Sequence, residues 1–232
     1  MVYVDVRRRL LISAAGLVLA TPVLADSRRQ AAPKKKTAEG TIIPATERLM
    51  RNNGVLLRVL LIYEAGIRRL GHGEDIDPVV FTQTAETMRD FIHDYHEKAE
   101  EEQVFPRFKT AGRMVELINV LIAQHGVGRQ LTERILKAAP GSSSKDQRTA
   151  MIEAMQASIT LYRPHVARET TDVLPTLRSL VTPNEFDELG ESLAKEENTK
   201  IGAGGLEKMA KKVEELEKRI GIHDLAQFTP KT

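Results

Sequence analysis

Apolar residues recur along the chain from Pro44 onward with a period of about 3.6, the spacing of amphipathic α-helices. No segment alternates apolar and polar residues for long enough to indicate a β-strand. Breaks at Gly71–His72–Gly73, Gly112 and Pro140–Gly141 separate four long periodic segments joined by short connections. The pattern therefore predicts an all-α protein, an up-down-up-down four-helix bundle with extra C-terminal helices. The predicted helices span residues 45–70, 78–109, 114–138 and 146–180, then 183 to the break at 202–205, and 206–220.

Caps and prolines indicate where several of these helices begin or bend. Asp77 is a predicted N-cap with Pro78 at the first helical position. Thr182 and Glu185 have the spacing of a capping box, with a proline between them. Pro164 and Pro175 predict interruptions in the fourth helix because proline breaks the helical hydrogen-bond ladder.

Residues 1–25 have the pattern of a cleaved export signal. Arg7, Arg8 and Arg9 form a basic start, an apolar run covers 10–20, and Val23–Leu24–Ala25 provides a cleavage site. The run is shorter than the about 20 apolar residues that span a bilayer. The paired arginines resemble the bacterial twin-arginine signal, with an ordinary secretory signal as the alternative. The segment predicts a bacterial periplasmic protein with no stable membrane span after signal removal.

The remaining chain divides into three predicted parts. Residues 26–43 are charged and poor in apolar side chains, which predicts a disordered linker. Residues 44–181 make up the four-helix bundle, and residues 182–232 make up a C-terminal helical extension.

The composition excludes several kinds of chemistry. The chain has 232 residues and no cysteine, which excludes disulfides, thiolate metal sites and cysteine nucleophiles. Its 34 basic and 32 acidic residues give a net charge of +2, which does not indicate binding to nucleic acid. The predicted signal holds three arginines and one aspartate, so the mature chain is neutral. The sequence shows no phosphate loop, nucleophile elbow or general acid–base constellation. None of these motifs is therefore available to predict a substrate-converting enzyme.

Two histidines begin the same spacing on different predicted helices. His96 precedes Glu100 and His165 precedes Glu169 by four residues, so each pair lies on one helix face. His125, near the middle of the third helix, offers another imidazole toward the bundle interior. Imidazoles and carboxylates without sulfur suit iron or manganese, with zinc also possible. The pattern favours a metal site, although one such pair alone is common on helix surfaces.

Three segments resemble the hemerythrin-like, His-His-Glu cation-binding family. They read HEKAEEEQVFP at 96–106, QHGVGR at 124–129 and YRPHVARE at 162–169, and they follow the family's order. The resemblance implies a four-helix bundle around a non-haem di-iron centre. It implies terminal imidazole ligands and bridging carboxylates, with a further carboxylate that is a ligand in some members. The implied imidazoles are His96, His125 and His165, the bridges are Glu100 and Glu169, and the further carboxylate is Glu97.

The chain departs from the family in its first helix, where Asn53 stands in place of the expected histidine. We therefore expect an asymmetric site with one firm metal and one that is weak, exchangeable or absent. His93 is interpreted as solvated, with binding of a displaced metal as the alternative. Glu101 and Glu102 are also interpreted as a solvated face, and His72 and His223 as exposed.

The resemblance implies O2 or redox sensing, or the handling of iron or NO, with O2 or NO as possible ligands. Loss of the first-helix imidazole argues against a stable O2 carrier. The alternative is a helical interaction protein with a decaying or mononuclear zinc or manganese site. No particular protein partner follows from the sequence.

Overall fold

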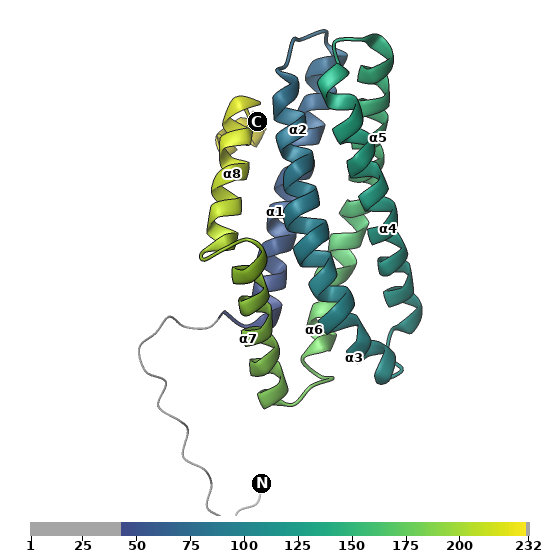
Figure 1. Ribbon diagram of the computed structural model, residues 1–232, viewed down its shortest axis with the longest axis vertical. Coiled ribbons are helices and arrows are strands. Elements are labelled where there is room, and N and C mark those ends of the chain that lie inside the picture. The colour runs from purple at the N-terminus through teal and green to yellow at the C-terminus, as the bar shows by residue number, and fades with distance from the viewer. Residues whose placement is uncertain (1–42, 231–232) are drawn as a thin grey trace, which may run out of the picture. The chain divides into compact units, whose positions relative to one another are not determined.

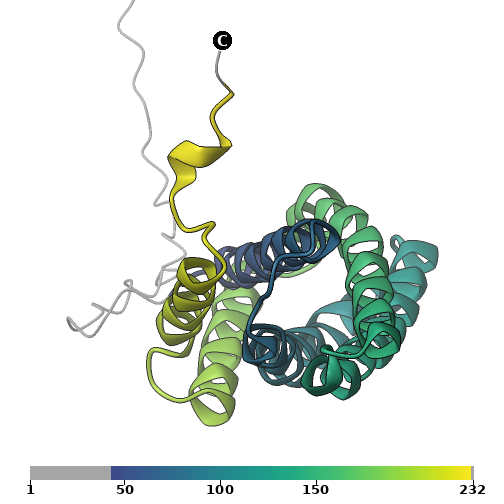
Figure 2. The ribbon, with the colours of Figure 1, turned by 90° about the horizontal axis from the view of Figure 1, so that it is seen from above.

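Four helical segments surround a common interior in the computed structural model, which describes residues 43–230 (Figures 1 and 2). The described residues contain no strand, which confirms the all-α prediction. The first segment is α1 (Ala45–Gly71), and the third is α4 (Val115–Ala138). The second consists of α2 (Pro78–Thr87), η1 (Met88–Glu97), η2 (Glu100–Val104) and α3 (Phe105–Thr110). The fourth consists of α5 (Lys145–Arg168), η4 (Glu169–Val173) and α6 (Leu174–Leu177).

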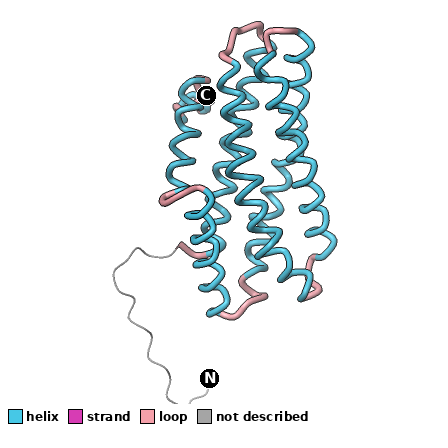
Figure 3. Tube along the Cα trace, viewed as in Figure 1, coloured by secondary structure: helices cyan, strands magenta, loops and turns pink. Residues whose placement is uncertain are grey.

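Short turns join consecutive segments at opposite ends of the bundle, so neighbours run antiparallel (Figure 3). One of these turns contains the 3₁₀ element η3 (Ala139–Gly141). Two further helices, α7 (Pro183–Lys200) and α8 (Gly205–Arg219), lie beside α1 and the second segment (Figure 2). A final 3₁₀ turn, η5 (Leu225–Phe228), follows.

The predicted caps form, but one predicted interruption does not. Asp77 accepts a hydrogen bond from the Val79 amide, and Thr182 and Glu185 complete a reciprocal capping box. Pro164 lies inside α5, which continues to Arg168, so the interruption expected there was wrong. The helix instead widens into a π-helical turn, η4, after Arg168.

The core consists of two apolar clusters with a layer of polar side chains between them. One cluster includes Leu56, Phe91 and Met155, while the other includes Leu49 and Phe105. Each helical segment has buried polar residues between the positions that contribute to the two clusters, and these are Asn52 and Asn53, His96 and Glu97, His125, and Glu169. The bundle therefore holds its polar layer away from both ends.

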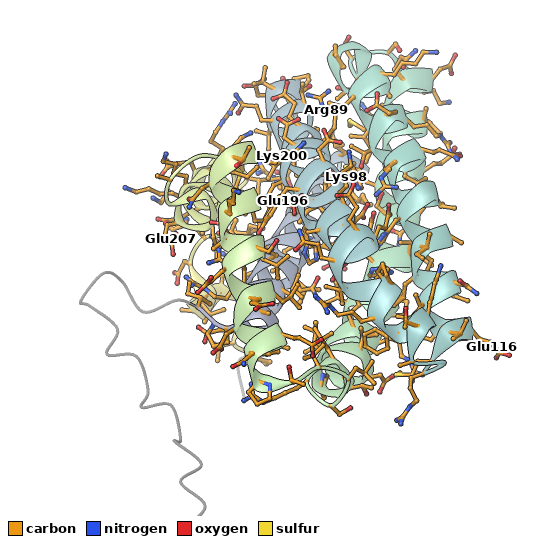
Figure 4. All side chains as sticks on the ribbon, turned by 60° about the horizontal axis from the view of Figure 1, so that its bottom comes forward. Arg89, Lys98, Glu116, Glu196, Lys200 and Glu207 are labelled. Carbon is orange, nitrogen blue, oxygen red and sulfur yellow. The ribbon has the colours of Figure 1, made fainter. Side chains whose placement is uncertain are left out.

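The C-terminal extension covers one side of the bundle with both apolar and charged contacts. Phe186, Leu189 and Leu193 of α7 join one cluster, and α8 joins the other. Figure 4 labels Lys98, Glu196 and Lys200 where α7 passes the second segment. Burial and the nearby Glu102 raise the pKa of the Glu196 carboxyl. The two lysines lower it, but they offset only part of that rise.

Two predictions concern the membrane and export. No helix within residues 43–230 is long and apolar enough to cross a bilayer. The predicted signal at 1–25 and almost all of the predicted linker at 26–43 lie outside the described residues.

Candidate metal centre

The polar layer gathers the predicted ligands from three of the four helical segments, and α1 adds Asn53. Each of these side chains belongs to a residue that is 3% exposed or less. The second segment, α4 and the fourth segment supply the imidazoles and carboxylates. The residues are Asn53, His96, Glu97, Glu100, His125, His165 and Glu169.

Two adjoining groups of ligand atoms form within this layer. His96, Glu100 and Glu169 offer three atoms that all lie within 4.8 Å of one another. His125, His165 and Glu169 offer a second such group. Glu100 lies between them, 3.8 Å from His96 Nε2 and 3.7 Å from His125 Nε2. The arrangement therefore has two potential metal positions with carboxylates between them, and we call these the His96 position and the His125 position.

A shared local sequence shapes the helix around both carboxylates. His, Glu, Val and Pro recur with the same spacing at residues 96–106 and 165–175. In each case the residue before the proline donates its amide to the carbonyl of the glutamate five residues earlier. Proline lacks an N–H, and its ring excludes the carbonyl four residues earlier, so the ladder shifts to π-type bonds. Glu100 and Glu169 begin these widened turns, η2 and η4.

His125 and His165 both turn their Nε2 atom toward the interior of the polar layer. His125 Nδ1 lies 2.8 Å from Glu101 Oε1, and His165 Nδ1 lies 3.0 Å from Gln124 Oε1. These oxygens accept hydrogen bonds, so both imidazoles carry their proton on Nδ1. The bare Nε2 atoms then face each other across 3.3 Å. A metal-binding histidine commonly donates its other nitrogen to such an acceptor.

The arrangement fits a bound cation. Glu100 Oε2 and Glu169 Oε1 are buried without a hydrogen-bond partner among the described residues. Burial and the neighbouring Glu169 raise the pKa of Glu100 well above its usual range. Burial raises the pKa of Glu169, but the His165 imidazole, whose Nε2 lies 3.0 Å from Glu169 Oε1, outweighs burial and holds that pKa below its usual range. A divalent cation would satisfy the orphaned oxygens and relieve the repulsion between the two carboxylates.

The neighbours of the His96 position differ from those of the His125 position, because they include two asparagines of α1. His96 Nε2 lies 3.1 Å from Asn53 Oδ1, while Asn53 Nδ2 donates to Glu169 Oε2 over 3.1 Å. The amide oxygen of Asn53 thus lies where a ligand from α1 would be needed, although an amide is a weaker ligand than imidazole. On the other side of the ring, Asn52 Nδ2 lies 3.5 Å from His96 Nδ1.

Glu97 lies beside the His125 position and has several partners within the protein. His93 Nδ1 lies 3.0 Å from Glu97 Oε2, and the Tyr162 hydroxyl donates to Glu97 Oε1 over 2.7 Å. Despite the opposing effect of burial, these contacts lower the pKa of Glu97 to about 2. With Glu101 and His125, Glu97 forms a third group of possible ligand atoms. Glu97 is therefore an ionised carboxylate within reach of a metal.

Two predictions about neighbouring side chains were wrong. His93 is 3% exposed rather than solvated, and its Nε2 lies 2.8 Å from Thr132 Oγ1. Both of its nitrogens have protein partners, so it supports Glu97. Glu101 faces His125 and Arg129, because the helix carries it one turn beyond Glu97 on a similar face. Glu102, His72 and His223 are exposed, as expected.

Sequence reasoning missed several supporting residues. Gln124 directly precedes His125, and Asn52 precedes the noted Asn53, but neither has a spacing that indicates a contact with histidine. Tyr162 is the first residue of the segment at 162–169, but nothing in that segment indicates its hydrogen bond to Glu97. Glu101 follows Glu97 by four residues, and this spacing could have indicated that both carboxylates lie on the helix face that meets the site.

An all-α bundle with a buried layer of imidazoles and carboxylates defines a class of helical cation-binding proteins. Residues 45–177 match the family described as Hemerythrin HHE cation binding domain, and the chain belongs to this family. It is also similar to uncharacterized proteins of Mycobacterium bovis and Mycobacterium tuberculosis. Each is 38% identical over 231 residues, covering 97% of this chain and 91% of the relative. No solved structure matches this chain.

Proposed function

We propose that this protein is a non-haem iron-binding protein of the bacterial cell envelope that senses O2 or redox state, or handles iron or NO. The observation that carries metal binding is the pair of inward Nε2 atoms of His125 and His165 beside two orphaned carboxylate oxygens. Iron fits this donor set because borderline divalent metals accept both imidazole and carboxylate, and the chain has no cysteine to supply a thiolate.

The proposed centre contains one firm and one weaker iron. His125, His165 and Glu97 would hold the firm iron, with Glu100 and Glu169 bridging to the other. His96 and the Asn53 oxygen would hold the weaker one. A bound iron pair supplies reversible binding of O2 or NO and electron transfer. The protein contributes a dry interior, since the layer lies between two apolar clusters, and hydrogen bonds that orient the imidazoles.

A role in sensing or handling is supported by this asymmetry. Oxygen storage needs a stable pair of irons, whereas an exchangeable iron would respond to iron supply or redox state. The predicted export signal supports an envelope location. Fractionation of cells that express the full chain tests export, with the double variant Arg7→Lys, Arg8→Lys as the comparison. We expect periplasmic wild-type protein and retention of the variant; equal export of both would contradict the twin-arginine route.

Metal analysis of the purified full chain tests the iron proposal. We expect between one and two irons per chain, visible absorption from a ferric pair, and a lower Tm after chelation. His165→Ala should lower the iron content, whereas the exposed His223→Ala should not. A colourless wild-type chain with no metal and no response to chelator would contradict the proposal.

The second candidate is a helical interaction protein whose metal site is decaying or mononuclear, and Asn53 favours it. A single zinc or manganese ion in the purified chain would support the mononuclear form. Absence of any metal would support the interaction protein.

A further inference from the structure

Three polar side chains connect the buried polar layer to the surface of the bundle. Each predicted ligand in that layer is 3% exposed or less. Among the described residues, the half-exposed side chains that form hydrogen bonds or ion pairs with these ligands are Glu101, Arg129 and Gln124. These side chains therefore mark the places at which the layer lies nearest to solvent.

The two kinds of opening differ in their chemistry. Gln124 lines a surface groove of about 710 Å³ between α4 and α5, where mostly apolar walls and a neutral amide stand before His165. At the other opening, Glu97 and Glu101 present two carboxylates one helical turn apart. Carboxylates concentrate a divalent cation at an opening, whereas apolar walls do not. A metal ion is therefore drawn to the opening at Glu101.

A positive charge of the protein already lies between these two carboxylates. Arg129 Nη2 lies 2.8 Å from Glu101 Oε1 and 3.2 Å from Glu97 Oε2. The exposed fraction of the side chain is 38% for Arg129, 25% for Glu101 and 1% for Glu97, so the contact runs from the surface inward. The same carboxylates form a group of possible ligand atoms with His125. The guanidinium thus blocks the carboxylates that an entering cation would first meet.

Arg129 can leave this place without a movement of the helices. Its side chain is partly exposed, and exposed side chains change rotamer within nanoseconds. The guanidinium keeps its charge at all working pH values, so it opens the path only by swinging into water. Glu97 stays in place because His93 and the Tyr162 hydroxyl still contact its two oxygens.

We propose that Arg129 is a gate through which metal ions enter and leave the His125 position, with Glu101 as the first carboxylate that binds an entering ion. The gate controls how fast the metal exchanges and has little effect on how tightly it is held. The inference rests on the proposed metal-binding function.

Arg129→Ala tests the inference, and alanine preserves the helix at this partly exposed position. Mixing the metal-free full chain with Co²⁺ gives the rate of uptake from visible absorption, and a chase with excess chelator gives the rate of release. We expect both rates to rise about tenfold, the lower end of the effect of charge at the opening of a site. The dissociation constant should stay nearly unchanged, because a gate lies on the path in both directions.

Two other roles of Arg129 predict different results. If Arg129 only orients Glu97, release becomes faster without faster uptake. If it acts only through its charge, uptake becomes faster without faster release. Either result would overturn the inference.

Two control variants test where the metal enters. Arg134→Ala removes the same charge from α4, where Arg134 is 57% exposed and pairs with Glu153, outside the layer. Thr160→Trp covers the groove beside Gln124 from its exposed rim. Neither variant should change either rate. Faster exchange in Arg134→Ala to the same extent, or slower exchange in Thr160→Trp, would overturn the inference.

Free guanidinium provides a further test, because it has the shape and charge that pair with two carboxylates. Guanidinium chloride far below denaturing concentration should slow exchange in Arg129→Ala toward the wild-type rate, whereas sodium chloride at equal ionic strength should not. Equal effects of the two salts, or unchanged rates in Arg129→Ala, would overturn the inference alone. A wild type that binds no Co²⁺ would overturn the proposed function as well.

Discussion

Glu101 Oε1 accepts a hydrogen bond from His125 Nδ1 over 2.8 Å and a second one from Arg129 over the same distance. The carboxylate therefore fixes the His125 tautomer and lies at the edge of the buried layer, with its side chain 25% exposed. These contacts outweigh the opposing effect of its partial burial and lower the pKa of Glu101, which keeps the carboxylate ionised at neutral pH. A charged acceptor at this place strengthens His125 as a ligand.

Glu101→Gln should weaken metal binding at the His125 position by about tenfold, because a neutral amide is a poorer partner for the ligand imidazole. Co²⁺ titration of the full chain measures the change. Glu102→Gln removes the same charge from the next, exposed residue and should leave binding unchanged. Equal effects of the two substitutions would mean that only the local charge matters.

Asn53→His should raise the metal content to two ions per chain at low metal concentration. The substitution supplies an imidazole from α1 where the Asn53 oxygen now lies 3.1 Å from His96 Nε2. Elemental analysis after dialysis against a weak chelator measures the stoichiometry. Asn119→His places an imidazole on the exposed face of α4 and serves as the control. No gain from Asn53→His over this control would contradict the placement of the second metal.

Metal binding should release a proton from Glu100. Burial and Glu169 raise the pKa of Glu100, so this carboxyl keeps its proton at pH values where a free glutamate has lost it. The metal displaces that proton, and apparent affinity therefore falls as the pH falls through the raised pKa. Burial lowers the pKa of His96 to about 4, so this imidazole is already neutral at pH 7 and releases none.

Calorimetry in two buffers with different ionisation enthalpies measures this release. Glu100→Gln has no carboxyl proton to lose and should bind more weakly, with less proton release. If wild type and variant released the same number of protons, Glu100 would not be the source.

Gly128→Ala should destabilise the bundle, whereas Gly126→Ala should not. A Cβ at Gly128 would lie 1.8 Å from the Tyr162 hydroxyl, which donates to Glu97. Overpacking of this kind costs about 1–3 kcal/mol. A Cβ at Gly126 meets nothing within 4 Å, so alanine there should stabilise α4 by up to about 1 kcal/mol. Urea unfolding of both variants measures the difference, and similar stabilities would contradict the tight contact at Tyr162.

Much of the fold and of the candidate site was predictable because it depends on local spacing. The helical period predicted the helices closely, so that the stretch predicted at 45–70 is α1, Ala45–Gly71. Four-residue spacing placed His96 with Glu100 and His165 with Glu169. The π-helical turns after both glutamates were not predicted, because they depend on how a proline is accommodated within a packed helix.

The sequence by itself determined the helices, the imidazole and carboxylate chemistry, and the substitution of asparagine for the expected histidine at position 53. These follow from residue type and separation along one helix. Tertiary structure alone decided that His93 is buried against Thr132 and that Asn52 contacts His96. It also brought Glu197 of α7 to Tyr95, across 102 residues of sequence. Such contacts depend on how faces of different helices meet, and the spacing within one helix does not specify its neighbour's register.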